Sequence, residues 1–225
     1  MSTWTTTGWQ STDVAERRPP ELRREAILDA AIRLVARKGF AAVTLRDVAG
    51  EVGVAHGLLR HYFASRDQLL ASAFDRAVAA ELATTCDLDG DPRVALASWL
   101  AATPREYYLV WIDAWSEAPR NAALLTALTR HHLACERRLL TIIERGVHDL
   151  AFETTSPGDT ARILTALADG LAVQHHALGV IDGGEYDGLV YTQAERLLAL
   201  PPGSLASAAR RASAVALKRG EWLAG

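Results

Sequence analysis

Two short helical segments on either side of a glycine constrain the fold of this chain most strongly. Thr44, with Asp47 three residues later, is close to the capping box that begins a helix, and Gly53 ends that helix after about two turns. A second short helix is predicted over residues 56–62. Two short helices joined by a glycine-containing turn, among longer helices, predict a helix-turn-helix.

The rest of the chain has apolar side chains at the three- and four-residue spacing typical of helices. A helix that starts near Glu21 is predicted to end at Gly39, where a left-handed C-cap is expected, and Ser65 with Gln68 offers a second capping box. Since no long stretch alternates like a strand, the fold class is all-α. Further helices are predicted near 92–102, 104–117, 120–150, 157–179, 185–199 and 204–220.

Composition excludes several classes of protein. With 225 residues, 49% of them hydrophobic, the chain can bury a core, and no apolar run approaches the roughly 20 residues that cross a bilayer. The N-terminus lacks the pattern of a secretory signal, and the two cysteines form no spaced pair. We therefore expect a cytoplasmic protein with no membrane partner.

The net charge of −3 conceals an asymmetry along the chain. Residues 1–80 carry eleven Lys and Arg against nine Asp and Glu, which gives +2, whereas residues 81–225 carry thirteen against eighteen, which gives −5. A mildly basic front third followed by an acidic remainder favours two separate roles for the two parts.

The predicted helix-turn-helix has the residues of a DNA-reading element. Its apolar side chains share one side, and a polar group with Arg46, Arg60 and His61 is left to face outward. A short helix held by its partner can place such side chains in the major groove, where each base pair presents a distinct pattern of donors and acceptors. A plain helical hairpin with a solvated polar face is the alternative.

The stretch from Arg23 to Leu70 resembles the DNA-binding domain of the TetR family of bacterial transcriptional regulators. The resemblance depends on Gly39-Phe40, Thr44-Leu45-Arg46-Asp47-Val48-Ala49, Gly53-Val54-Ala55, Gly57-Leu58-Leu59-Arg60-His61-Tyr62-Phe63, Ser65-Arg66 and Leu69-Leu70. It implies an N-terminal three-helix DNA-binding domain and a C-terminal helical domain. It also implies a homodimer that binds a pseudo-palindromic operator on double-stranded DNA.

The resemblance assigns roles to individual positions. Thr44 matches the threonine that caps the second helix and meets a phosphate, and Gly57 lets the backbone approach the groove. Tyr62 matches an aromatic position that reaches the DNA backbone, and Arg66 stands where a lysine usually binds phosphate. The predicted DNA-binding residues are Thr44, Arg46, His56, Gly57, Arg60, His61, Tyr62 and Arg66.

Three residues depart from the family pattern. Ala55 stands where a serine often caps the recognition helix, so that end is expected to lack a side-chain cap. Leu58 replaces a common threonine and removes one phosphate contact. Arg60 replaces a common tyrosine and adds a cation that can bind a phosphate or a guanine edge. We therefore expect an operator preference unlike that of the commonest members.

The C-terminal two thirds is expected to dimerise and to bind a ligand. The segment 168–174, with 111–115 before it, resembles the C-terminal domain of the betaine-inhibitory-regulator branch. Dimerisation in the family uses the last two helices, which correspond here to 160–178 and 189–200. We divide the chain into a flexible arm (1–20), a DNA-binding domain (21–66), a ligand-binding and dimerisation domain (67–203) and a C-terminal extension (204–225).

Aromatic side chains in this domain suggest a ligand cavity. Tyr108, Trp111 and Trp115 lie on one helical face, and Asp113 and Glu117 could serve as polar anchors. Such a cavity suits an apolar or a cationic inducer, although simple core packing explains aromatic residues equally well. The predicted ligand-binding residues are Trp99, Tyr108, Trp111, Trp115, His132, Cys135 and His175.

Other functions are less well supported by the sequence. The His131-His132-x-x-Cys135 group lacks a fourth ligand, so we expect a core histidine beside a thiol and no metal or other cofactor. No phosphate-binding glycine loop or nucleophile elbow suggests an enzyme. The expected function is a repressor released by a small inducer. The alternative is a DNA-binding regulator without a small ligand, controlled by a protein partner or by its own level.

Overall fold

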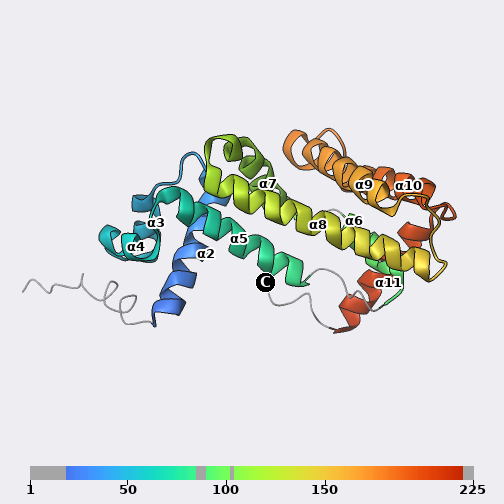
Figure 1. Ribbon diagram of the computed structural model, residues 1–225, viewed down its shortest axis with the longest axis horizontal. Helices are drawn as coiled ribbons and strands as arrows, with labels where there is room; N and C mark the ends of the chain where they lie inside the picture. Colours follow the sequence, from blue (N-terminus) through green and yellow to red (C-terminus); the bar gives the residue numbers. More distant parts are fainter. Residues whose placement is uncertain (1–18, 85–89, 102–103, 220–225) are drawn as a thin grey trace, which may run out of the picture. The chain divides into compact units, whose positions relative to one another are not determined.

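The computed structural model describes residues 19–84, 90–101 and 104–219, and every regular element in those ranges is a helix (Figure 1). This confirms the all-α prediction. Of the flexible arm predicted over 1–20, residues 1–18 lie outside the described residues. The helices are α2 (Pro20–Lys38), α3 (Leu45–Val52), α4 (His56–Tyr62), α5 (Arg66–Thr84), α6 (Pro92–Leu100), α7 (Arg105–Glu117), α8 (Ala122–His148), α9 (Pro157–Ala172), α10 (Gly183–Leu197) and α11 (Ser204–Arg219), with a 3₁₀ turn, η1 (Ala118–Arg120), and a π-helical segment, η2 (Val173–Leu178).

The chain forms two compact units. Unit 1 comprises residues 1–81 and 110–131, and unit 2 comprises residues 82–109 and 132–225. The helices α7 and α8 each contribute residues to both units. The domain limits drawn from the sequence at residues 66 and 203 therefore differ from the limits of these units, and they stay predictions.

Unit 1 is built around aromatic rings that come from the loop after α2, from α5 and from α7. The Phe40 and Phe74 rings are fully buried and meet edge to face with centroids 6.2 Å apart, and Trp111 meets Phe74 in the same way at 5.2 Å. Edge-to-face pairs of this kind stabilise a core beyond the area they bury. The α2 residues that the helical spacing marks as apolar are buried against it: Ile27, Leu28, Ala31, Leu34 and Val35.

Two glycines of unit 1 adopt positive φ angles, but in different conformations. Gly53 ends α3 with φ 75° and ψ 35°, the left-handed conformation that the turn between α3 and α4 requires. Gly39 has φ 81° and ψ 159°, so it is not the left-handed C-cap predicted from the sequence. The chain leaves α2 in an extended direction instead, which carries Phe40 into the core.

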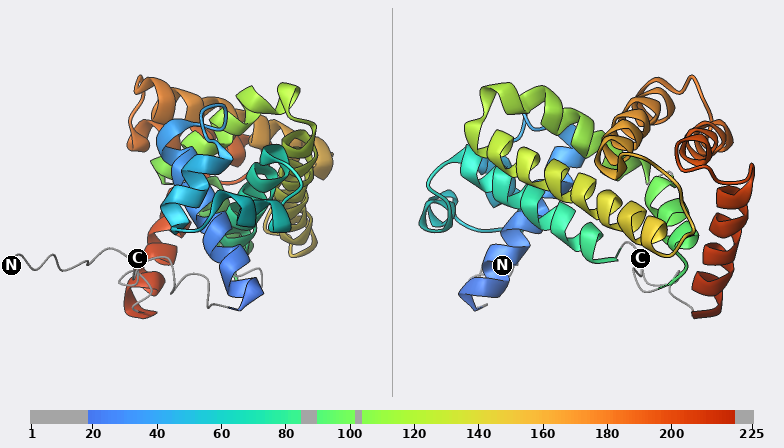
Figure 2. Two further views of the ribbon diagram at one scale, coloured as in Figure 1. Left: turned by 90° about the vertical axis from the view of Figure 1, so that its left-hand side faces the viewer. Right: turned by 45° about the vertical axis from the view of Figure 1, so that its right-hand side comes forward.

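Unit 2 packs α6, the second part of α8, and α9, α10 and α11 around one apolar core. The helix predicted in the C-terminal extension is confirmed as α11, which lies beside α6 (Figure 2) and buries Leu205 and Ala208. The Glu195 carboxylate, 6% exposed, accepts the backbone N–H groups of Gly203 and Leu205 at 2.9 Å. This carboxylate therefore fixes the start of α11 on α10. Residues 220–225 lie outside the described residues.

Local geometry corrects two of the predicted helix limits. The helix expected over 157–179 is α-helical only to Ala172 and continues as the π-helical segment η2. The helix α10 begins at Gly183, two residues earlier than predicted, because Asp182 and Glu185 form a complete capping box around it. No helix among the described residues is long and apolar enough to cross a membrane.

Candidate nucleic-acid interface and ligand cluster

The start of α3 is fixed by a complete capping box. The Thr44 hydroxyl accepts the Asp47 N–H at 3.1 Å, and the Asp47 carboxylate accepts the Thr44 N–H at 2.9 Å. The hydrogen bonds from Thr44, helped by Lys38 at 3.0 Å, lower the pKa of Asp47 to about 2. The first turn of α3 is therefore held in place at neutral pH, with Thr44 exposed.

The helix α4 exposes four of the five of its residues that the sequence assigned to DNA, all except Tyr62. It buries Leu59 towards the rest of unit 1, and its start at Ala55 has no side-chain cap, which confirms the expectation from the sequence. Figure 1 shows α3 and α4 as two short neighbouring helices in unit 1, and α3 packs on α2. The predicted DNA-binding residues that are exposed are Thr44, Arg46, His56, Gly57, Arg60 and His61.

Two further contacts tie the end of α4 to α2. The half-buried Tyr62 hydroxyl accepts a hydrogen bond from the Arg23 guanidinium at 3.1 Å. The Arg24 guanidinium lies over the Phe63 ring, 5.4 Å from its centroid, at the distance of a cation–π contact. Tyr62 thus has a structural partner within unit 1, and its contact with DNA stays a prediction.

The Arg66 guanidinium donates its hydrogen bonds to groups within unit 1. Its guanidinium donates to the carbonyl oxygens of Val43 at 2.6 Å, Ala41 at 3.1 Å and Phe40, and it also pairs with Asp67 at 3.1 Å. These carbonyl groups belong to the loop between α2 and α3. The structure therefore gives Arg66 a loop-holding role that the sequence did not suggest, while its phosphate contact stays a prediction.

In unit 2, Tyr108 lies in a cluster of polar and aromatic groups. Its hydroxyl donates to the Asp169 carboxylate at 3.2 Å, and its ring stacks on the His176 ring with centroids 5.1 Å apart. The His175 ring lies 4.3 Å from His176 and 6.1 Å from Tyr186. We call Tyr108, Asp169, His175, His176 and Tyr186 the ligand cluster.

Burial sets the protonation of this cluster. It raises the pKa of Asp169, while the nearby His132 and the Tyr108 hydroxyl act in the opposite direction. Burial, followed by the Asp169 charge, also raises the pKa of Tyr108, so this hydroxyl stays protonated and donates. The pKa of His176 is lowered by burial and then by His175 and Arg105. Among the residues that the structure describes, its Nε2 has no hydrogen-bond partner. The cluster thus holds a carboxylate whose ionised form is disfavoured by burial, and a buried imidazole with one ring nitrogen unpaired among the described residues.

The structure separates the predicted ligand-binding residues into two groups. Trp111 is 7% exposed and packs with Phe74 in unit 1, and Trp115 lies beside it with centroids 6.0 Å apart. In unit 2, Tyr108 and His175 belong to the ligand cluster, and Trp99 packs against the core. His132 and Cys135 act electrostatically on the cluster, on Asp169 and Tyr108 respectively.

Three members of the ligand cluster were not predicted from the sequence as site residues: Asp169, His176 and Tyr186. Asp169 stands within the segment 168–174 that carries the resemblance to the betaine-inhibitory-regulator branch, and that signal could have marked it. His176 follows His175 in the π-helical segment η2, and the structure places both imidazole rings in the same cluster. Tyr186 had no distinguishing signal.

The neighbouring residues His131 and His132 belong to different units. The His131 ring, 8% exposed, approaches the Asp75 carboxylate at 2.8 Å and meets the Phe74 ring edge to face in unit 1. His132 belongs to unit 2. Among the residues that the structure describes, no three His, Cys, Asp or Glu side chains are grouped to hold a metal ion.

Comparisons with known proteins agree with this arrangement. Residues 27–73 match the model of the bacterial regulatory proteins of the tetR family, and residues 93–199 match that of the BetI-type transcriptional repressor C-terminal domain. The HTH-type transcriptional regulator BetI of Agrobacterium fabrum is 34% identical over 167 residues, which cover 68% of this chain and 77% of that protein. The chain belongs to the TetR family and is a DNA-binding transcriptional regulator of the BetI type, not an enzyme.

Two solved structures with bound ligands share the fold. A transcriptional regulator from Saccharomonospora viridis in complex with choline is 25% identical, with a TM-score of 0.66 over 79% of this chain and 98% of that one. The multidrug binding protein EbrR complexed with ethidium is also 25% identical, with a TM-score of 0.61 over 78% of this chain and 98% of that one.

Proposed function

We propose that this regulator is a cytoplasmic homodimeric repressor that binds a pseudo-palindromic operator and is released by a small organic cation. The observation that carries the proposal is the half-buried Asp169 carboxylate among the rings of Tyr108, His176 and their neighbours. Aromatic and imidazole rings around one carboxylate suit a cation that carries methyl groups. The ligands of the two related structures, choline and ethidium, are organic cations.

The energetics of Asp169 support a cationic inducer. Burial raises the pKa of this carboxylate, so its ionised form is disfavoured in the folded protein. A bound cation adds an opposite charge and therefore favours this form, as the nearby His132 also does. The unpartnered Nε2 of the buried His176 offers a second polar contact for the ligand, such as a hydroxyl group. A ligand with both features would bind better than either a simple alkane or a metal ion.

Exposed apolar side chains on α9 and α10 support the dimer. Ile163 on α9 is 51% exposed and Leu189 on α10 is 46% exposed, and Leu178 and Val180, between these helices, are each 64% exposed. The two helices lie side by side in unit 2 (Figure 1). Large apolar side chains exposed on these helices and on the segment between them favour association with a second copy.

The proposal is tested by selecting duplexes that bind the protein from random DNA at about 150 mM salt. We expect an enriched pseudo-palindrome bound by two chains, as measured by the mass of the complex. Choline should release this DNA, whereas its neutral carbon isostere, dimethylbutanol, should not. Equal binding of all sequences would refute specific repression. Release by neither compound would favour the alternative of a regulator without a small ligand.

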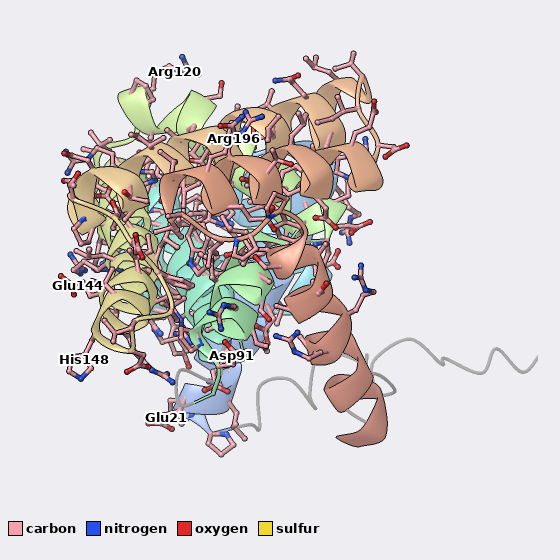
Figure 3. All side chains as sticks on the ribbon, turned by 90° about the vertical axis from the view of Figure 1, so that its right-hand side faces the viewer. Glu21, Asp91, Arg120, Glu144, His148 and Arg196 are labelled. Carbon is pink, nitrogen blue, oxygen red and sulfur yellow. The ribbon has the colours of Figure 1, made fainter. Side chains whose placement is uncertain are left out.

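Arg60 offers a direct test of base reading. If its guanidinium binds a guanine edge, Arg60→Ala should weaken binding to the selected duplex by about 1–3 kcal/mol and relax the preference at one position. Fluorescence anisotropy against single-base variants of the duplex measures both effects. The control is Arg120→Ala, which removes the same charge from an exposed side chain of unit 1 (Figure 3). A uniform loss over all duplexes would mean that Arg60 contacts phosphate only.

A further inference from the structure

The loop of residues 39–43, between α2 and α3, is held from two sides within unit 1. On one side Arg66 of α5 binds three of its carbonyl groups. On the other side the Asp113 carboxylate of α7 accepts the backbone N–H of Phe40. The sequence offered Asp113 as a polar anchor of the ligand cavity, but the structure places its carboxylate on this loop.

The geometry around Gly39 leaves room for this carboxylate. A Cβ at Gly39 would lie 3.1 Å from Asp113 Oδ2, and its φ of 81° disfavours any side chain there. The next residue, Phe40, is fully buried against Phe74. The loop is thus fixed by a buried ring, by Arg66 and by Asp113, and it leads directly into Thr44, the cap of α3.

The contact also joins the two segments that the family models recognise. Phe40 lies in the segment 27–73 that matches the DNA-binding domain, and Asp113 lies in the segment 93–199 that matches the C-terminal domain. Nearby on the same helix, Trp111 packs on Phe74 and fixes this part of α7 in unit 1. The C-terminal segment therefore reaches the loop that precedes α3 through a specific hydrogen bond.

We propose that Asp113 is a positioning residue for DNA binding, which acts through Phe40 on the loop that begins α3. Without this hydrogen bond the loop and the start of α3 occupy more than one position. The free energy of ordering α3 and α4 then has to come from DNA binding, which weakens the affinity for DNA. The inference rests on DNA binding by unit 1 and is independent of the proposed cationic ligand.

The direction of the change in DNA affinity distinguishes a positioning role of Asp113 from a purely electrostatic one. Asp113→Ala and Asp113→Asn both remove a negative charge, which by itself strengthens the attraction to phosphates. Positioning predicts the opposite: Asp113→Ala should bind the selected duplex about tenfold more weakly. Asp113→Asn should lose only about twofold to threefold, since its amide oxygen can still accept the Phe40 N–H. Glu144→Gln removes an exposed carboxylate of α8 (Figure 3) and should change the affinity less than twofold.

The experiment measures the affinity of the full chain for the duplex selected by the wild type, together with hydrogen exchange of the peptide 39–44. Exchange in this peptide should be fastest in Asp113→Ala and intermediate in Asp113→Asn, while peptides from unit 2 stay unchanged. Binding by Asp113→Ala as tight as wild type, or tighter, overturns the proposal. If that variant does not fold, faster exchange in Asp113→Asn with unchanged affinity overturns it. A wild type that selects no duplex would instead refute DNA recognition itself.

Discussion

Asp169→Asn is expected to make the ligand-free protein more stable and to abolish its response to a cation. Burial raises the pKa of Asp169, so the ionised carboxylate opposes folding at neutral pH, whereas a neutral amide does not. The asparagine oxygen can still accept the Tyr108 hydroxyl. Removing one partner of a buried charge pair weakens binding by about 2–5 kcal/mol, so choline affinity should fall at least about thirtyfold.

The dependence on pH follows from the direction of the shift. Because the pKa of Asp169 is higher in the folded than in the unfolded chain, this group lowers stability as pH rises above its unfolded value of about 4. The stability advantage of Asp169→Asn should therefore shrink as the solution is made acidic. Choline binding by the wild type should weaken over the same range, since protonation removes the charge that holds the cation.

Thermal unfolding and calorimetric titration with choline measure the two effects of this substitution. Glu144→Gln serves again as the control, since it neutralises an exposed carboxylate of unit 2. An Asp169→Asn protein that is no more stable than wild type would contradict the account of the buried charge. One that still binds choline as the wild type does would remove Asp169 from the ligand site.

Gly146→Ala should destabilise unit 2 strongly, although alanine is usually the better helix former. In an ordinary helix this change gains about 0.5–1 kcal/mol. Here a Cβ at Gly146 would overlap the ring of Phe152, which is 2% exposed in the core. The Ala151 and Phe152 N–H groups both bind the Gly146 carbonyl, at 2.8 and 3.0 Å, so the ring cannot easily move away. We expect a net loss of about 2–4 kcal/mol.

Urea unfolding followed by circular dichroism measures this loss. The matched test is the double variant with Phe152→Leu, in which a smaller side chain leaves space for the new methyl group. Gly146→Ala should cost much less in that background than in the wild type, which gives a large coupling energy between the two positions. Equal costs in both backgrounds would show that the ring overlap is not the cause.

The local features of the fold could be predicted because they depend on neighbours in the chain. Thr44 and Asp47 are three residues apart, and their capping box appears in the structure as the sequence suggested. Gly53 ends α3 as predicted, and α3 and α4 have the predicted limits. Gly39 shows where this reasoning fails, because the burial of Phe40 in the core and not the helix end decides its ψ angle.

The candidate site was only partly predictable. The exposed positions of α4 follow from helical periodicity, so Arg60 and His61 face outward as predicted. The partners of the half-buried polar groups do not follow from it. Asp113 and Phe40 are 73 residues apart, and Tyr108 and Asp169 are 61 residues apart, and no local pattern records either pair.

By itself, the sequence determined an all-α chain with a helix-turn-helix, and its motifs identified the family, because capping, helical spacing and exposed polar residues act within a few positions. Only the tertiary structure decided how the polar and aromatic side chains of the interior are used. It assigned Trp111 to the packing of unit 1, Arg66 and Asp113 to the loop before α3, and Asp169 to the ligand cluster. The reason is physical: a buried polar group takes whichever partner helix packing brings within hydrogen-bond distance.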